Sequence, residues 1–146
     1  MPLELFKRLL GAPSGEPLHP DDARRAIAAL LVMAARADNH YADSERSLID
    51  RLLMERYGLS AEAARALRAE GEAAEEEAVD HYQFTRAIRD AIPLEERLSI
   101  IEALWKVVLE DAGRDAMEDT LMRQLTERLG LSPRESAEAR QRVQDA

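Results

Sequence analysis

The sequence predicts an all-α fold of about seven to eight helices, arranged as two pseudo-symmetric helix-turn-helix units. Three observations support this fold class. Apolar residues recur at spacings of three and four along most of the chain, and no segment sustains the period-two alternation of a strand. Ala, Leu, Glu and Arg, which all favour helix, dominate the composition. Finally, residues 31–59 and 104–131 share one order of apolar and acidic positions.

The N-terminal residues 1–20 differ in pattern from the remainder of the chain. A short amphipathic segment, Pro2–Leu10, precedes a Gly- and Pro-rich loop, Gly11–Pro20. The segment is either a terminal helix packed on the domain or an interfacial anchor, and the scarcity of basic residues favours the former. Because 146 residues suffice to bury one core, we expect a single domain over residues 1–146.

Capping and turn residues predict where each helix begins and ends. Acids suit a helix start, Ser, Asp and Pro open a helix, and Gly ends one. The run EGEAAEEEAVD over residues 70–80 carries six acids and no base, so we expect a solvated face or a mobile connection there. The first predicted helix is about Asp21–Ala37, and the second follows the turn Asn39–Asp43 and ends near Tyr57, before Gly58. The next three are Ala61–Gly71 after Ser60, His81–Ala91 after Asp80, and Leu94–Glu110 after Pro93. One further helix is capped by Asp115, and the last is opened by Ser132-Pro133.

The two repeated stretches place acidic residues on their apolar faces. In each unit an Asp continues the apolar row of the first helix and a Glu begins that of the second, so four carboxylates should point toward the core. This position is costly unless something compensates the charge. The aligned positions are Leu31, Asp38, Glu45, Leu48 and Leu52 with Leu104, Asp111, Glu118, Leu121 and Leu125, and Gly58-Leu59-Ser60 with Gly130-Leu131-Ser132.

Composition and motifs exclude several classes of protein. The absence of cysteine rules out disulfides, thiolate metal sites and a cysteine nucleophile. A net charge of -9 argues against nucleic acid and anionic lipid as partners. No Gly-rich phosphate loop, HExxH or GxSxG motif is present, so we expect a protein without enzymatic activity. Since the first residues resemble neither a signal peptide nor a membrane span, we expect a cytoplasmic protein.

The residues of both acidic turns resemble the TerB-like (tellurite resistance protein B) family, in an uncharacterised bacterial branch. The resemblance covers roughly residues 23–143 and also includes VDHYQFTRAI and EERLSIIEALW. The family pattern is Ala-Asp-Gly, an acid four residues after the Asp, and a Glu seven after it. It maps onto Asp38 and Glu45 in the first turn, and onto Asp111, Asp115 and Glu118 in the second. The departures are Asn39 and Ala112 at the glycine, Ala42 at the first middle acid, and Glu110 at the alanine.

The resemblance implies a compact helical bundle associated with bacterial responses to tellurite and other chemical stress. It also implies a divalent-metal site formed by Asp38, Glu45, Asp111, Asp115 and Glu118. Hard oxygen ligands would favour Ca²⁺ or Mg²⁺, whereas His40 would shift the preference toward Zn²⁺ or Mn²⁺. Neither turn has the spacing or the central glycine of an EF-hand.

Structural explanations of the same acids compete with metal binding. A carboxylate in the first turn of a helix interacts with free backbone N–H groups, and an Asp can cap the turn. The charges could also be neutralised by Arg36, Arg46, Arg97 or Arg114. Two main functions therefore remain open: a metal-responsive stress module, or an acidic adaptor that recruits a basic protein partner and whose carboxylates are purely structural. A hydrolase using the paired carboxylates is a third.

Overall fold

The computed structural model of the chain describes residues 19–37, 39–80, 82–110 and 116–146, and the side chains of residues 116–118 lie outside this description. Throughout the described part the regular structure is helical, with seven helices and no strand, which confirms the predicted all-α fold. The helices are α2 (Pro20–Arg36), α3 (Asp43–Tyr57), α4 (Ala61–Glu77), α5 (Gln83–Ala91), α6 (Leu94–Glu110), α7 (Ala116–Arg128) and α8 (Pro133–Asp145).

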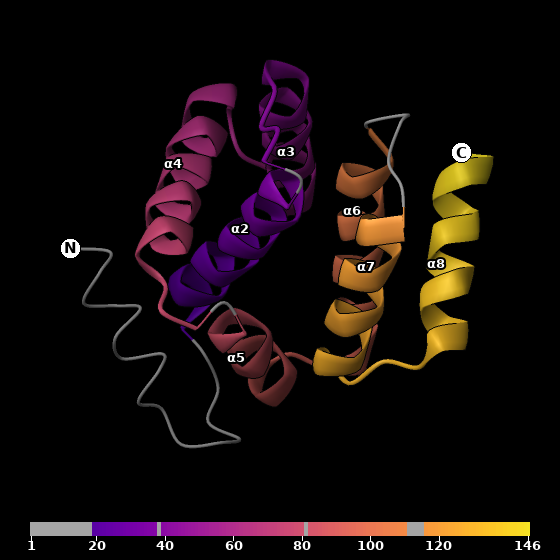
Figure 1. The fold of residues 1–146 in the computed structure, drawn as a ribbon. Coiled ribbons are helices and arrows are strands. Elements are labelled where there is room, and N and C mark those ends of the chain that lie inside the picture. The colour runs from indigo at the N-terminus through magenta and orange to yellow at the C-terminus, as the bar shows by residue number, and fades with distance from the viewer. Residues whose placement is uncertain (1–18, 38, 81, 111–115) are drawn as a thin grey trace.

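The helices form two groups of three. Figure 1 shows α2, α3 and α4 together on one side, α6, α7 and α8 on the other, and α5 between them at one end. Within the groups, α4 packs most extensively on α2, and α8 packs mainly on α6. The groups meet where α2 and α3 contact α6.

Helix α2 lies at the centre of the fold. Ten consecutive residues, from Ala26 to Ala35, are buried, so the helix has no solvent-facing side over this stretch. Such all-round burial is possible because neighbouring helices cover each face, and because the alanines let them approach closely. Its contacts with α3, α4, α5 and α6 make α2 the element on which both groups depend.

Matching turns connect the second and third helices of each group. Gly58 (φ 65°) and Gly130 (φ 75°) adopt the left-handed conformation that ends a helix. Each turn leads to a serine that caps the next helix: Ser60 Oγ accepts the N–H of Ala63 at 3.1 Å, and Ser132 Oγ accepts that of Glu135 at 3.0 Å. The sequence predicted the helix starts at both serines and the helix stop at Gly58, and the alignment of the two repeated stretches placed Gly130 opposite Gly58.

The prediction for the acidic run was wrong at its helix boundary. Helix α4 continues through Gly71 to Glu77, and Gly71, Ala74 and Glu75 are buried. Gly71 lies directly against α2, where an added Cβ would come within 2.7 Å of the Ala28 carbonyl carbon. Only the end of the run, with exposed Glu76, is solvated as expected.

The start of α5 also differs from the prediction. The helix begins at Gln83, whereas His81, the predicted first residue, lies outside the described residues. Asp80, the predicted cap, is not the N-cap residue of α5, which is Tyr82; its Oδ1 accepts the N–H of Tyr82 at 2.9 Å, just before the helix. No helix of the described residues is both long and apolar enough to cross a membrane.

Candidate functional site at the first acidic turn

The described residues include only part of the predicted carboxylate cluster. Asp38, Asp111 and Asp115 lie outside them, and Glu118 lies in the first turn of α7 with its side chain likewise outside. Glu45 is the one predicted ligand whose side chain is described. The convergence of four carboxylates therefore stays a prediction.

Glu45 lies in the first turn of α3, on the inner side of the turn. Its relative exposure is 3 %, as expected for a residue that begins an apolar row. The carboxylate Oε1 accepts the N–H of Ala42 at 3.0 Å. This bond is one half of a capping box; Ala42, which has no side-chain oxygen, cannot supply the other half. Glu45 thus has the helix-capping role that was one of the structural alternatives.

The turn before Glu45 explains one departure from the family pattern. Asn39 stands at the family's glycine position and adopts φ 62°, the only non-glycine residue in the described part of the chain with a positive φ. Asn enters this left-handed region more readily than most residues with a side chain. The turn is closed by a hydrogen bond from the Asn39 N–H to the Arg36 carbonyl, at 2.9 Å. A tight left-handed turn is therefore kept without glycine.

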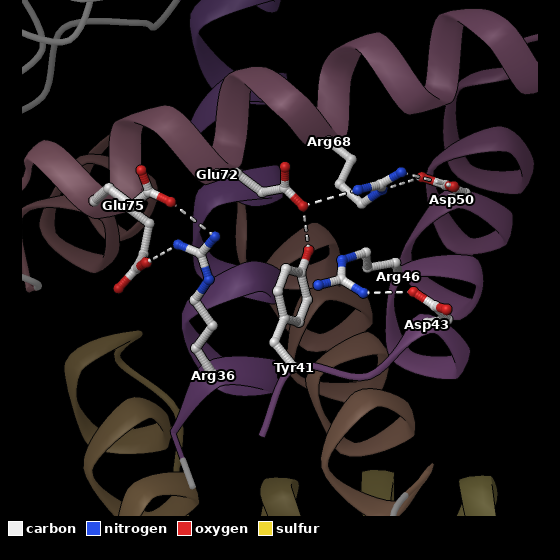
Figure 2. A network of polar contacts seen from close by, with 9 residues as sticks. Arg36, Tyr41, Asp43, Arg46, Asp50, Arg68, Glu72 and Glu75 are labelled. Carbon is white, nitrogen blue, oxygen red and sulfur yellow. Dashed lines mark hydrogen bonds and ion pairs between the residues drawn. The ribbon is translucent and has the colours of Figure 1, made fainter. Parts of the chain in front are cut away.

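Tyr41 connects this turn to α4, as Figure 2 shows. Its hydroxyl donates to Glu72 Oε2 at 2.6 Å. The same oxygen accepts from Arg68 at 2.8 Å, and Arg68 Nε donates to Asp50 of α3 at 2.7 Å. One chain of polar contacts thus joins the acidic turn, α4 and α3.

Two guanidinium groups lie against the Tyr41 ring. Arg36 is 4.9 Å and Arg46 4.4 Å from its centroid. At these distances a cation is attracted by the ring quadrupole. Arg36 also donates to Glu75 at 2.6 Å, which holds the end of α2 to the far half of α4. Arg46 pairs with Asp43 at 2.6 Å, within the first turn of α3.

These contacts shift the protonation equilibria of the network. Burial raises the pKa of Tyr41 well above its usual value of 10, and the hydrogen bond to Glu72 adds to the rise. Burial also acts to raise the pKa of Glu72, but hydrogen bonds from Tyr41 and Arg68 outweigh it, so that this pKa is lowered. The bond to Asp50 raises the pKa of Arg68. The network therefore favours a neutral tyrosine and an ionised glutamate.

The four arginines considered as neutralising groups have different roles. Arg36 and Arg46 take part in the network of Figure 2. Arg97 donates to the carbonyl oxygens of Ile92 and Leu129, at 2.9 and 2.6 Å, and so ties the start of α6 to the end of α7. Arg114 lies outside the described residues.

The network around Tyr41 was not predicted from the sequence. Two of its pairs have local spacing: Arg68 and Glu72 are four residues apart on α4, and Asp43 and Arg46 are three apart on α3. The other pairs, such as Arg36 with Glu75, join residues far apart in the sequence, and no spacing rule predicts them.

No metal site can be assembled from the described side chains alone. Among them, no three His, Asp or Glu groups lie close enough to hold a metal ion. Four of the five predicted ligands have side chains outside the described residues, so the predicted site stays a prediction.

A groove with a partly apolar lining lies between α7 and α8. Trp105 of α6 is buried and lines this open groove of about 530 Å³. Its indole N–H donates to Ser136 Oγ at 3.0 Å, and Arg140 lies 4.8 Å from the ring centroid.

Comparison with known proteins identifies one family. The family model described as "Tellurite resistance protein TerB" matches residues 24–141. This match agrees with the resemblance found over residues 23–143 and confirms it. Searches of curated proteins and of solved structures gave no match.

Proposed function

The chain belongs to the TerB family, and from that premise we propose that it is a non-enzymatic module of the bacterial tellurite and chemical-stress response that binds a divalent cation. The proposed ligands come from the two acidic turns. Oxygen donors of this kind select Ca²⁺ or Mg²⁺ in preference to softer metals. The module acts in the cytoplasm. The ligand set is Asp38, Glu45, Asp111, Asp115 and Glu118.

The observation that supports this proposal is the position of Glu45. A carboxylate that is only 3 % exposed is costly to bury unless its charge is compensated. The N–H of Ala42 supplies one compensating hydrogen bond. A cation shared by Glu45 with Asp38 and the acids of the second turn would compensate several negative charges at once.

The direct test is a calorimetric titration of the chelator-treated protein with Ca²⁺, Mg²⁺, Mn²⁺ and Zn²⁺. Heat is expected with at least one of them, together with a higher Tm, because a ligand that binds only the folded state stabilises it. At a concentration 100 times the Kd, the gain is about 2.7 kcal/mol. The double variant Asp38→Asn, Asp111→Asn should lose both responses. Glu62→Gln, which changes an exposed acid of α4, should keep both.

A protein that gives no heat and no change in Tm with any of the four cations at millimolar concentration would contradict the proposal. That outcome would favour the adaptor hypothesis, in which the carboxylates only stabilise the fold. A net charge of -9 and the exposed acids Glu62, Glu76 and Glu77 on α4 support a basic protein as the partner of such an adaptor. The variant Glu76→Lys, Glu77→Lys should then weaken partner binding and leave the Tm almost unchanged.

A further inference from the structure

A second surface of the protein, distant in the sequence from both acidic turns, has the properties of a docking groove. It lies where the start of α2, the end of α3 and the connection between α5 and α6 meet, and we call it the N-terminal groove. Its volume is about 590 Å³. Its apolar lining comes from Ala23, Ile27, Tyr57, Ile92 and Pro93.

The walls of the N-terminal groove remain partly open to solvent. Ala23 and Tyr57 are only half-buried, and Pro93 is exposed. Leu94, next to Pro93, has 45 % of its surface exposed and is one of only two large apolar residues that are exposed in the described part of the chain. An apolar groove with an exposed leucine beside it leaves hydrophobic surface in contact with water, so covering it would be favourable.

Charged residues of both signs border the groove. Arg24 lies 4.6 Å and Arg56 5.8 Å from the centroid of the Tyr57 ring, and Arg56 donates to Ser99 Oγ at 2.9 Å. Glu96 supplies a negative charge on the α6 side. A segment suited to this groove would have apolar residues on one face, flanked by acidic and basic residues.

The segment Pro2–Leu10 has this composition. Its apolar residues recur at helical spacing, and Glu4, Lys7 and Arg8 provide charges of both signs. The segment itself lies outside the described residues. As a helix, its nine residues would be roughly 13 Å long, at about 1.5 Å per residue. The apolar residues are Leu3, Leu5, Phe6, Leu9 and Leu10.

Chain connectivity places this segment near the groove. Pro20, the first residue of α2, is itself part of the groove lining. Residues 11–19 join it to the segment and can span roughly 30 Å when extended, at about 3.3 Å per residue. Attachment at the groove's own edge gives the segment a high effective concentration there, which no free peptide has. We propose that Pro2–Leu10 docks in the N-terminal groove and covers its apolar lining within the same molecule.

A spin label provides the test on the full chain. Because the chain has no cysteine, Lys7→Cys creates a unique thiol for a nitroxide. If the segment docks, the methyl signals of Ile27 and Ile92 should broaden and largely disappear, and reduction of the label should restore them. The control comes from α8, which Figure 1 shows on the other side of the bundle from α2: Val143 of this helix should keep its signal.

Two further variants show whether apolar contact holds the segment. Phe6→Glu in the labelled chain should restore the Ile27 and Ile92 signals by releasing the segment. Ala23→Glu, which places a charge in the wall of the groove, should do the same, with folding checked by Trp105 fluorescence. Phe6→Glu changes no described residue, so the test stands even if Ala23→Glu impairs folding.

Three outcomes would overturn the proposal. The first is unchanged Ile27 and Ile92 signals in the labelled chain. The second is broadening between molecules when labelled chains are mixed with unlabelled, isotope-enriched ones, which would show that the segment docks on a second copy. The third is immobilisation of the label only in the presence of vesicles rich in anionic lipid, which would identify the segment as a membrane anchor.

Discussion

Replacing Gly71 by alanine should destabilise the protein, although alanine is the better helix former. In an exposed helical position this change would add about 1 kcal/mol of stability. Here the new Cβ would lie 2.7 Å from the Ala28 carbonyl carbon and 2.9 Å from the Ala29 nitrogen. These atoms are backbone of a buried helix, so they cannot rotate away as a flexible side chain would.

The size of the effect follows from the overlap. Carbon atoms in contact prefer separations of about 3.5–4.0 Å, so α2 and α4 must move apart by roughly 1 Å. Overpacking of this kind costs about 1–3 kcal/mol of stability, and the cost is higher where the backbone must shift. Subtraction of the gain of about 1 kcal/mol in helix propensity leaves a loss of about 0–2 kcal/mol, and we expect the upper end because backbone atoms must shift. For a chain of this length, a loss of about 2 kcal/mol lowers the Tm by roughly 4–8 °C.

Urea denaturation followed by circular dichroism measures this change, as a lower midpoint with an unchanged slope. Ala73→Gly, at an exposed position of the same helix, is the matched control and should cost about 1 kcal/mol through propensity alone. If Gly71→Ala instead stabilises the protein, the close approach of α4 to α2 is wrong, and the helix boundary predicted from the sequence regains support.

Two further predictions concern the network around Tyr41. The pKa of Tyr41 is raised in the folded protein. The contribution of Tyr41 to stability is therefore complete below pH 10 and is lost as the pH rises through the pKa of the folded state. Tyr41→Phe should flatten this loss in thermal melts recorded between about pH 9 and 11. Tyr82→Phe is the control, since Tyr82 bonds to Gln124 outside the network and the change leaves the Tyr41 contribution in place. An identical pH dependence of wild type and Tyr41→Phe would contradict the assignment. The pKa of Glu72 is lowered in the folded protein. The contribution of Glu72 to stability is therefore present above the usual pKa of about 4.5 and is lost as the pH falls through the lower pKa of the folded state. Glu72→Gln should make the protein less stable at neutral pH and less sensitive to acid. Glu62→Gln should keep the wild-type acid dependence, and the Glu72 assignment fails if both variants behave alike.

Local signals in the sequence predicted those parts of the fold that depend on local chemistry. Ser60 and Ser132 cap helices because a hydroxyl satisfies a free backbone N–H. Gly58 and Gly130 end helices because they adopt a left-handed conformation at little cost. Such features involve residues within a few positions of each other, so the printed sequence contains all the information needed.

The extent of α4 depended on contacts that no local pattern contains. Six acids within the eleven residues 70–80, with no base, predict repulsion, and a glycine predicts a helix end. In the folded chain, Arg25 pairs with Glu70 and Arg36 with Glu75, and both arginines come from α2. Gly71 does not end the helix; because it has no side chain, it allows α2 and α4 to approach closely. Tertiary contacts thus overrode two valid local signals.

The candidate site shows the same division. Burial of Glu45 followed from its place in an apolar row, and its structural bond to Ala42 followed from its position in a first helical turn. The link from this turn to α4 through Tyr41 did not follow from any spacing, because Glu72 lies 31 residues further along the chain.

This link gives the proposed cation site a physical connection to the rest of its helical group. Glu72 accepts from both Tyr41 and Arg68, and Arg68 holds Asp50 of α3. The acidic turn is therefore held by two helices before any cation arrives. A turn fixed in this way loses less conformational freedom on binding, which favours affinity. By the same contacts, a cation that moves Tyr41 must also move α4 or break its bond to Glu72. Helix α4 is therefore the element to which the proposed cation binding would be coupled through the bond between Tyr41 and Glu72.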